Sequence, residues 1–444
     1  MRTRCGRTLL ADPRGLVIAA PASGAGKTLV TLALLRALTR QGKSITSAKA
    51  GPDYIDPRFH EAASGGACFN LDCWAMREGY LAALAQACAG GSELVLIEGV
   101  MGLFDGAAGG GGTTADLARA LGLPVILVVD AQRQGRSAAA LVKGFAEFEA
   151  ECDVAGVIFN RVTSASHAAI LSEAVQALDM PVLGAVPETR EIAVPSRHLG
   201  LVQASEHAAL DAFLNRAADL VDGAVDLDAL GRMAKPLAPG GTAVKSLPPL
   251  GRRIAVARDE AFSFSYPHLL HAWRDAGAQI MPFSPLGGEA PDGAADAIYL
   301  PGGYPELHAG QLAANRAFMD ALGAAAARGA LIYGECGGFM TLGQYLIDAE
   351  GIRHRMAGLL PLGTSFAKRG LKLGYRRLTH TGALPWPEAL RGHEFHYSTL
   401  HWQGEADALF EARDSRGENL GEIGLRRDNV MGSYAHIIDM EGCP

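Results

Sequence analysis

The sequence contains no apolar run close to the roughly 20 residues that a membrane-spanning helix needs. The stretch from Met1 to Arg14 is basic but lacks the apolar segment of a secretory signal. We therefore expect neither a transmembrane helix nor a membrane as partner.

Cysteine is also sparse, and its pattern carries no metal signature. The seven cysteines are Cys5, Cys68, Cys73, Cys88, Cys152, Cys336 and Cys443. Their number is odd, they are scattered, and no CxxC pair or Cys/His cluster indicates zinc. The expected location is a reducing cytoplasm.

Charge of one sign is not in large excess. A net charge of −7 and an isoelectric point near 6.0 give no reason to expect nucleic acid or an anionic membrane as partner. Hydrophobic residues make up 49% of the chain and charged residues 20%, which is typical of a globular protein with a well-formed core. The length of 444 residues indicates two or three domains.

Short apolar runs alternate with helical patterns from Gly15 to Val221. This alternation predicts an α/β fold with a parallel sheet covered by helices. Prolines and glycines then interrupt the pattern, and a second α/β pattern begins at Arg253. We therefore predict a first domain at 1–222, a linker at 223–251 and a second domain at 252–444.

The second half contains a cysteine with glycines close on both sides, in Gly334-Glu-Cys336-Gly-Gly338. An apolar run precedes it and a helical pattern follows. Such a strand, tight turn and helix form a nucleophile elbow, here with cysteine in place of serine. The start of a helix is expected to lower the pKa of the thiol. A buried structural cysteine in a glycine-rich turn is the less favoured alternative.

The first half begins with a strand, a glycine-rich loop and a helix that starts at Gly-Lys-Thr, which is the pattern of a phosphate-binding loop. The residues expected to bind ATP are Ser23, Gly24, Ala25, Gly26, Lys27 and Thr28. Lys27 would neutralise phosphate charge, and the Thr28 hydroxyl would bind Mg²⁺. The first glycine of the usual pattern is replaced by Pro21. Asn160 ends a later strand and could contact the purine, or it could be a turn residue.

Acidic side chains follow two neighbouring strands of this predicted sheet. Ligands bind at the carboxyl ends of parallel strands. Asp53 and Glu98 are therefore candidate Mg²⁺ ligands, together with Thr28. Tyr54, Asp56 and Asp105 lie in the same loops and are expected to contact the substrate. Solvated loop carboxylates are the alternative for each acid taken singly.

A second glycine-rich loop, Pro301-Gly-Gly-Tyr-Pro-Glu306, follows an apolar run ahead of the cysteine. The backbone N–H groups of Gly302 and Gly303 could form an oxyanion hole for a thioester intermediate. Spacing does not decide which histidine serves Cys336, because a catalytic histidine is adjacent in space rather than in sequence. His436 and the pair His393/His396 remain equal candidates at this point.

Taken together, the motifs resemble those of the a,c-diamide synthases of corrinoid biosynthesis. The resemblance covers nearly the whole chain. It rests on Ala-Pro-Ala-Ser-Gly-Ala-Gly-Lys-Thr, Lys-Ala-Gly-Pro-Asp-Tyr-Ile-Asp-Pro, Glu-Gly-Val-Met-Gly-Leu-Phe-Asp-Gly, Leu-Pro-Gly-Gly-Tyr-Pro-Glu, Gly-Glu-Cys-Gly-Gly and Gly-His-Glu-Phe-His-Tyr-Ser. It implies a first domain similar to dethiobiotin synthetase and a second domain of the class I glutamine amidotransferase type. It also implies the substrates L-glutamine, ATP and a corrinoid tetrapyrrole, with Mg²⁺.

The resemblance identifies Cys336 as the nucleophile and His436 as its base. Class I amidotransferases usually carry Glu two residues after this histidine, but Ile438 stands there in this chain. The orienting carboxylate is therefore missing or supplied elsewhere, and Glu394 and Asp439 are weak candidates. The implied reaction is the amidation of the a and c carboxylates of hydrogenobyrinic or cobyrinic acid through acyl phosphates, with some leaning toward the cobalt-free acid.

Three alternatives share parts of this pattern. A cobyric acid synthase and a nickel-sirohydrochlorin a,c-diamide synthase would use similar domains on another tetrapyrrole. A regulatory ATPase of the partition type shares the irregular loop, but it would not need an amidotransferase half and usually has a second lysine early in the loop, where this chain has Ala22 and Ser23. For assembly, a homodimer is the default expectation.

Overall fold

A computed structural model describes residues 13–189, 196–197, 200–201, 203–207, 209–238 and 244–442. Most of the basic N-terminal stretch and the Pro-Gly-Gly of the predicted linker lie outside these residues. The chain forms two compact units. The first contains the chain up to Val244, apart from Ala75–Arg77 and Ala107–Gly110, which belong with Lys245 onward to the second.

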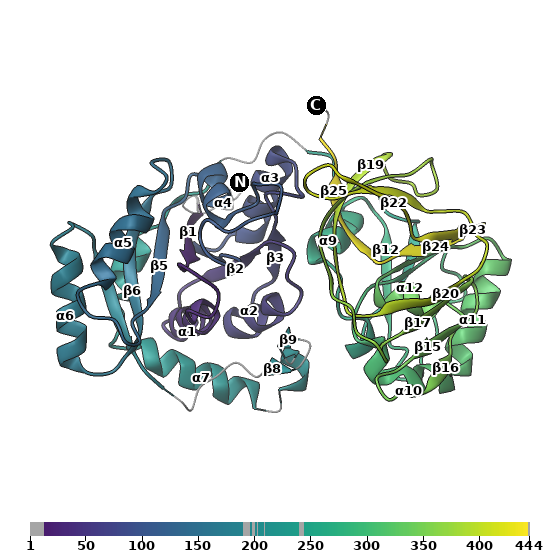
Figure 1. Ribbon diagram of the computed structural model, residues 1–444, viewed down its shortest axis with the longest axis horizontal. Coiled ribbons are helices and arrows are strands. Elements are labelled where there is room, and N and C mark those ends of the chain that lie inside the picture. Colours follow the sequence, from purple (N-terminus) through teal and green to yellow (C-terminus); the bar gives the residue numbers. More distant parts are fainter. Residues whose placement is uncertain are drawn as a thin grey trace, which may run out of the picture. The chain divides into compact units, whose positions relative to one another are not determined.

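The first unit is built on a parallel sheet in the order β3-β2-β4-β1-β5-β6-β7, with β10 antiparallel to β1 (Figure 1). Its strands are β1 (Arg14–Ala19), β2 (Ile45–Ala50), β3 (Cys68–Leu71), β4 (Leu94–Glu98), β5 (Val125–Asp130), β6 (Val154–Val162), β7 (Val182–Pro187) and β10 (Lys235–Pro236). A two-stranded hairpin joins β8 (Ser196–Arg197) and β9 (Gly200–Leu201). Its helices are α1 (Lys27–Arg40), α2 (Asp56–Ser64), α3 (Glu78–Ala89), α4 (Thr114–Leu121), α5 (Ala138–Glu147), α6 (Ala165–Gln176), α7 (Leu210–Val221) and α8 (Leu227–Met233).

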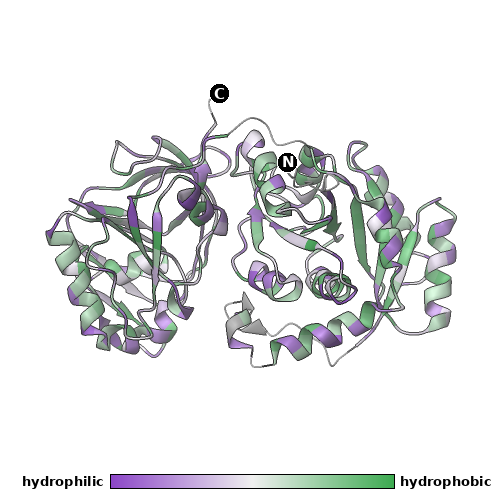
Figure 2. Ribbon diagram, turned by 180° about the vertical axis from the view of Figure 1, so that it is seen from behind, coloured by the Kyte–Doolittle hydropathy of each residue, from purple (hydrophilic) through white to green (hydrophobic). Residues whose placement is uncertain are grey.

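Both faces of this sheet are covered, as the alternation of strands and helices predicts. Leu16 and Ile18 point into a core shared with α1, α2, α7 and α8. Val17 lies between them in the strand and is equally buried, so the opposite face is covered too. In Figure 2 the strands of this sheet are largely green, whereas α7 alternates between green and purple, as a helix with one buried face should.

Local signals explain where individual elements begin. Thr113 caps α4 through a reciprocal pair of hydrogen bonds with Asp116. Gly26 has a φ of +88° and allows the turn from the loop into α1.

The predicted linker differs from the structure in its first half. Residues 227–236 form α8 and β10, and Leu227, Leu230 and Ala234 join the core of the first unit. The first unit therefore continues to Val244 instead of ending at 222. This short helix was not predicted, because the glycines and prolines around it are typical of a linker. The strand β3 was not predicted from the sequence. Its four residues are fully or almost fully buried.

The second unit has a central sheet in the order β12-β11-β13-β14-β24-β23, parallel except at β23. These strands are β11 (Arg253–Ala257), β12 (Gln279–Phe283), β13 (Ala297–Leu300), β14 (Leu331–Glu335), β23 (Leu425–Arg427) and β24 (Val430–Ser433). Its helices are α9 (Pro267–Asp275), α10 (Ala309–Ala314), α11 (Arg316–Ala327) and α12 (Gly337–Leu342).

Two further sheets complete this unit. One is antiparallel, in the order β22-β21-β18-β19-β25, and comprises β18 (Lys372–Thr379), β19 (Ala389–His396), β21 (Phe410–Arg413), β22 (Asn419–Ile423) and β25 (Ala435–Met440). The other has the order β16-β15-β17-β20 and comprises β15 (Tyr345–Ile347), β16 (Arg353–Arg355), β17 (Leu362–Ser365) and β20 (Thr399–Gln403). Among the residues that the structure describes, no helix combines the length and the hydropathy required to cross a membrane.

Candidate functional site

The phosphate-binding loop joins β1 to α1 in the first unit. Gly24 and Gly26 both have positive φ, at +84° and +88°. The Asn160 amide reaches over from β6 and donates a hydrogen bond to the Ala25 carbonyl at 2.9 Å. A Cβ on Gly26 would overlap the same amide nitrogen. Asn160 therefore braces the loop, and its predicted contact with the purine remains a prediction.

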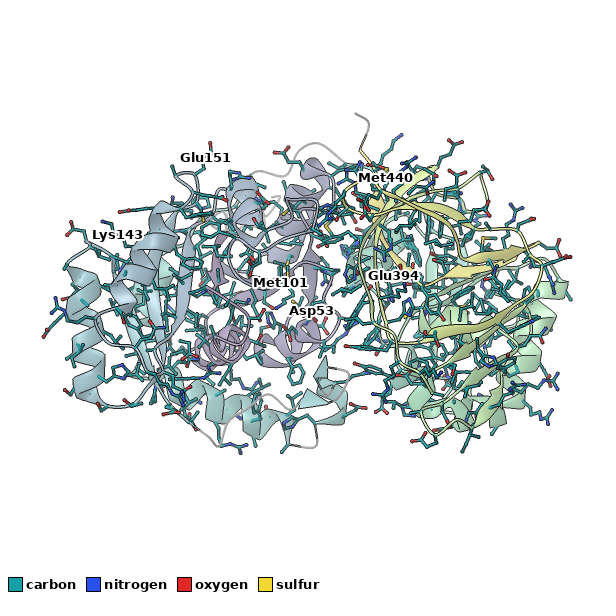
Figure 3. The ribbon with its side chains drawn as sticks, viewed as in Figure 1. Asp53, Met101, Lys143, Glu151, Glu394 and Met440 are labelled. Atoms are coloured by element: carbon teal, nitrogen blue, oxygen red, sulfur yellow. The ribbon has the colours of Figure 1, made fainter. Side chains whose placement is uncertain are left out.

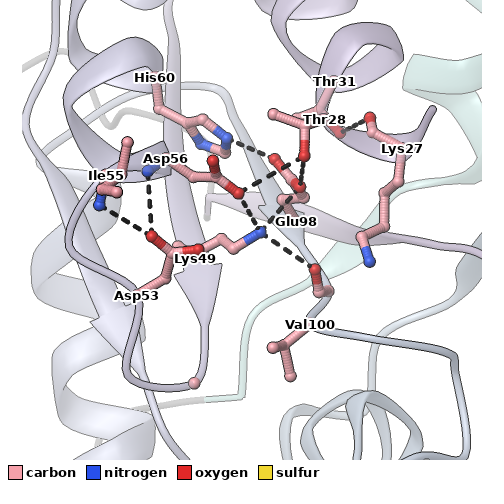
Figure 4. A network of polar contacts seen from close by, with 12 residues as sticks. Lys27, Thr28, Thr31, Lys49, Asp53, Ile55, Asp56, His60, Glu98 and Val100 are labelled. Atoms are coloured by element: carbon pink, nitrogen blue, oxygen red, sulfur yellow. Dashed lines mark hydrogen bonds and ion pairs between the residues drawn. The ribbon is translucent and has the colours of Figure 1, made fainter. Parts of the chain in front are cut away.

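A network of charged side chains lies next to this loop, where β2 and β4 end (Figure 4). Lys49 and Glu98 are partners across these two parallel strands. The Lys49 Nζ lies 2.8 Å from Glu98 Oε1 and 2.7 Å from Asp56 Oδ2. The Thr28 hydroxyl donates to Glu98 Oε1 at 2.7 Å. His60 contacts the other oxygen of Glu98 at 2.6 Å. The predicted pair Thr28 and Glu98 is thus brought together.

The charges in this network shift one another. Burial alone would raise the pKa of Glu98, but Lys49 and His60 hold that pKa below its ordinary value. Burial alone would lower the pKa of Lys49, but Asp56 and Glu98 outweigh it and raise that pKa. Burial and the charge of Asp53 raise the pKa of Asp56 to about 7. Burial and the charge of Lys49 lower the pKa of Lys27 to about 8. These shifts indicate a dry, closely coupled site.

The two acids of the loop that follows β2 lie in different surroundings. Asp53, predicted as a metal ligand, accepts hydrogen bonds from the backbone N–H groups of Ile55 and Asp56 at the start of α2. Asp56, predicted to contact substrate, instead lies 3.5 Å from the Thr28 hydroxyl through Oδ2. The two acids are three residues apart, and the helix that begins between them turns the second one inward. Spacing alone could not show this.

The remaining predicted substrate residues lie on neighbouring loops. Asp105 is exposed and accepts a hydrogen bond from Gly102 N at 3.0 Å, which closes a turn beside the Pro21 carbonyl. Tyr54 is half-buried between β2 and α2. Lys27 donates to the Met101 carbonyl at 2.8 Å, and Met101 has a φ of +49°. Asp53 and Met101 are both labelled in Figure 3.

Within the described ranges, no group of three or more His, Cys, Asp and Glu side chains is arranged to hold a metal ion by itself. The donor set nevertheless fits Mg²⁺, which takes one or two protein oxygens and completes its shell with phosphates and water. Thr28 Oγ1 and Glu98 supply such oxygens. Asp56 Oδ1 is buried and makes no hydrogen bond, so it offers a further acceptor.

The second site is centred on Cys336, at the junction of β14 and α12. Its φ of 47° and ψ of −102° are strained for a residue with a side chain. Close packing around the neighbouring glycines keeps the backbone of Cys336 in this strained conformation. A Cβ on Gly338 would overlap the Leu300 carbonyl, and Cys336 N donates to the Ser433 carbonyl at 2.8 Å. The predicted strand, tight turn and helix are present.

The prediction of a lowered thiol pKa is wrong for this site without substrate. Burial raises the pKa of the Cys336 thiol, and the charge of Glu306 raises it further. The N–H of Gly337 acts in the opposite direction but does not compensate. The helix that was expected to lower the pKa has only six residues. Cys336 therefore needs a base to remove its proton.

Three histidines were candidates for that base, and the structure separates them. His436 on β25 is buried and lies with Cys336 against Gly302. A Cβ on Gly302 would be 3.1 Å from His436 Nε2 and 3.3 Å from Cys336 Cβ. His393 pairs with His436 across β19 and β25. Both ring nitrogens of His396 already have partners, with Nε2 2.8 Å from Glu394 Oε1 and Nδ1 3.0 Å from the Ser398 carbonyl oxygen. The geometry favours His436.

The two carboxylates proposed as substitutes for the missing Glu are both engaged elsewhere. Glu394, labelled in Figure 3, holds Arg376 at 2.7 Å as well as His396. Asp439 is fully buried and holds Arg77, a residue of the same unit, at 2.9 Å. The carboxylate that lies beside His436 is Glu335, which reasoning from the sequence missed. The one feature of the sequence that could have indicated Glu335 is its position directly before the nucleophile Cys336.

The predicted oxyanion loop lies against the elbow. Gly302 accepts a hydrogen bond from Phe264 N at 2.9 Å through its carbonyl. The backbone nitrogen of Gly303 would lie 3.1 Å from a Cβ on Gly337. The same loop ends in Glu306, whose pKa burial raises to about 7. The loop therefore lies against Gly337, and the charge of Glu306 acts on the neighbouring Cys336.

Comparisons with known proteins cover both units. Residues 16–202 match the model of the CobQ/CobB/MinD/ParA nucleotide binding domain, and residues 253–442 match that of the CobB/CobQ-like glutamine amidotransferase domain. The chain is 56% identical to a hydrogenobyrinate a,c-diamide synthase of Brucella suis biovar 1 (strain 1330) over 97% of this chain and 99% of that protein. Proteins with the same name from Sinorhizobium sp and Rhodobacter capsulatus are 54% and 52% identical, each over 96% of this chain and 99% of the relative.

Proposed function

Because the chain belongs to the family of the corrinoid a,c-diamide synthases, to whose members it is 52–56% identical over nearly their full length, we propose that it amidates hydrogenobyrinic acid. The enzyme takes nitrogen from L-glutamine, consumes ATP, and converts the a and c side-chain carboxylates into amides. The printed names of the relatives favour the cobalt-free corrinoid over cobyrinic acid.

The observation that supports this proposal is that one chain combines two clusters of side chains suited to different chemistry. The first unit has a braced phosphate-binding loop with Thr28, Glu98 and Lys49 beside it. The second unit has a strained cysteine elbow with a buried histidine. A regulatory ATPase would need only the first of these sites.

In the second unit, Cys336 and His436 hydrolyse glutamine. His436 accepts the thiol proton while the sulfur attacks the amide carbon, and the same proton passes to the nitrogen as the C–N bond breaks. The products of this step are ammonia and a γ-glutamyl thioester. Gly302 and Gly303 would donate their N–H groups to the oxyanion. Water then attacks the thioester, gives its proton to His436, and releases glutamate while the proton returns to the sulfur.

In the first unit, the loop from Ser23 to Gly26 binds the phosphates of ATP, and Lys27 leaves the Met101 carbonyl to contact them. Thr28 and Glu98 would hold Mg²⁺, which neutralises phosphate charge when bound. A corrinoid carboxylate attacks the γ-phosphate to give an acyl phosphate and ADP. Ammonia then attacks the acyl carbon, loses a proton, and displaces inorganic phosphate.

The test compares hydrogenobyrinic and cobyrinic acids with ATP, Mg²⁺ and glutamine labelled at its amide nitrogen. We expect two successive replacements of OH by labelled NH₂ on hydrogenobyrinic acid, detected by mass spectrometry. Amidation of cobyrinic acid alone would overturn the choice of corrinoid. ATP hydrolysis without amidation of either acid would overturn the proposed function and favour another tetrapyrrole.

The Cys336→Ser variant divides the two half-reactions. It should lose glutamine-dependent amidation and keep amidation supported by free ammonia, because the acyl phosphate forms in the other unit. Loss of both activities in a folded variant would contradict the assignment of one half-reaction to each unit.

A further inference from the structure

Glu335 is the last residue of β14 and directly precedes the nucleophile Cys336. It is 1% exposed. Its Oε2 lies 3.6 Å from Nδ1 of His436 and accepts a hydrogen bond from the Tyr299 hydroxyl at 2.7 Å. Its Oε1 accepts a hydrogen bond from Ile437 N at 3.1 Å. These two hydrogen bonds fix the carboxylate on the Nδ1 side of the imidazole.

The Nε2 side of the same imidazole lies near the cysteine elbow. A Cβ placed on Gly302 would lie 3.1 Å from Nε2 of His436 and 3.3 Å from Cβ of Cys336. The ring therefore lies between the carboxylate and the elbow, with one nitrogen toward each. This is the order of groups in a nucleophile, base and acid triad.

The hydrogen bonds of Glu335 do not by themselves explain an acid at this position. Tyr299 and the Ile437 N–H are neutral donors, and a neutral amide oxygen could accept from either. A buried carboxylate is costly unless a positive charge compensates it. The group beside it that becomes positive during the reaction is His436, when it holds the proton of Cys336.

We propose that Glu335 is the positioning residue of the amidotransferase site and completes a triad of Cys336, His436 and Glu335. The acid comes from the residue before the nucleophile instead of the position two residues after the histidine, where Ile438 stands. Glu335 orients the Nδ1 side of the ring and stabilises the imidazolium in both proton transfers. This inference rests on the glutaminase half of the proposed function.

Other titratable groups also face His436 and must be separated from Glu335. His393 lies opposite it on β19, where burial and the charge of His436 lower its pKa to about 3. His393 is therefore neutral over the working range of the enzyme. Cys336 faces the ring from the elbow. The acidic limb of the glutaminase pH profile thus reports on His436, which must be neutral to accept the thiol proton of Cys336.

The test replaces Glu335 by Gln, which keeps the size and an acceptor oxygen but removes the charge. In the full chain with ATP, Mg²⁺ and corrinoid, we expect Glu335→Gln to lower the turnover number for glutamate release by about 100-fold. The KM for glutamine should stay within a few-fold. The acidic limb should move to lower pH by about one unit, because the imidazolium loses its compensating charge. Amidation supported by free ammonia should match the wild type.

Three matched variants exclude a purely structural effect. Tyr299→Phe removes a hydrogen bond to the same oxygen without removing the charge, and it should cost only a few-fold with no shift of the limb. Asp439→Asn alters another fully buried carboxylate, which holds Arg77, and it should leave the limb in place. Glu335→Asp should recover part of the turnover number and return the limb toward that of the wild type.

The outcomes distinguish this inference from the proposed function. Glutaminase activity of Glu335→Gln within a few-fold of wild type would overturn the triad, as would an equal loss of glutamine- and ammonia-dependent amidation with an unchanged pH profile. If the wild type amidates no corrinoid with either nitrogen source, the proposed function fails, but glutamate release by the two proteins still tests the triad.

Discussion

Replacing Gly302 by Ala should separate the two half-reactions without removing any catalytic group. Gly302 lies beside both the nucleophile and its base, and the new methyl group would contact both. It would lie 3.1 Å from His436 Nε2 and 3.3 Å from Cys336 Cβ, and closer than 3.0 Å to His436 Cε1. Ordinary contacts of a Cβ atom begin at 3.4 Å. The ring or the loop must therefore move.

The size of the effect follows from that displacement. To restore ordinary contact, the imidazole must move by about 1 Å away from the new methyl group, and a misplacement of that size costs about 100-fold in rate. The strained elbow is held by close glycine contacts and cannot follow the ring. We therefore expect glutamine-dependent amidation to fall by about 100-fold, whereas amidation supported by free ammonia stays near the wild-type rate.

The assay measures glutamate release and corrinoid amidation in parallel, with glutamine or ammonium as nitrogen source. Gly323→Ala is the matched control, because a Cβ on this α11 residue meets nothing within 4 Å. That variant should keep both activities. If Gly302→Ala hydrolyses glutamine as fast as Gly323→Ala, the placement of Cys336 and His436 about Gly302 is refuted.

Three other variants test the first unit. Glu98→Gln should reduce ATP-dependent amidation with either nitrogen source by about 100-fold, since Thr28 and Mg²⁺ lose their carboxylate, while glutamate release remains measurable. Gly26→Ala should reduce the same step and lower the free energy of unfolding by at least about 1 kcal/mol, because φ is +88° and the methyl group overlaps Asn160. Asp56→Asn should flatten the pH dependence of stability. The pKa of Asp56 is raised in the folded state to about 7, so its ionisation destabilises the fold progressively as the pH rises from about 4 to 7.

A control variant and contradicting results test these three predictions. Gly231→Ala, in α8, adds a methyl group that meets nothing within 4 Å and should leave amidation unchanged. Unimpaired ATP-dependent amidation by Glu98→Gln would remove Glu98 from the site. Urea unfolding of wild type and Asp56→Asn should give a difference in unfolding free energy that grows in favour of the variant with pH. A difference that is constant with pH would contradict the raised pKa.

Motifs with a rigid local geometry could be predicted from the sequence. The elbow at Cys336 and the phosphate-binding loop each need a strand, glycines at defined positions and a helix, so a short segment determines their form. The parallel sheet of the first unit could also be predicted, because strands that alternate with helices along the chain form parallel sheets. The short helix α8 was missed because its seven residues lie among the glycines and prolines taken for a linker.

Contacts between distant segments could not be predicted in this way. Glu335 and His436 are about a hundred residues apart, and they meet because β25 and β14 converge on one site. Asp53 and Asp56 lie in different surroundings because a helix begins between them. The pKa of Cys336 depends on its burial beside Glu306, which no local pattern records.

Lys49 gives the nucleotide site a counter-ion of its own. Its ammonium group lies between Asp56 and Glu98 before any metal or phosphate arrives, so the acids are already neutralised in large part. A divalent cation that comes alone must compete with this fixed charge and gains little by binding. The phosphates of the nucleotide change that balance, because they bring negative charge together with their own metal. We therefore expect a divalent metal to enter this site as a complex with the nucleotide and to bind weakly in its absence.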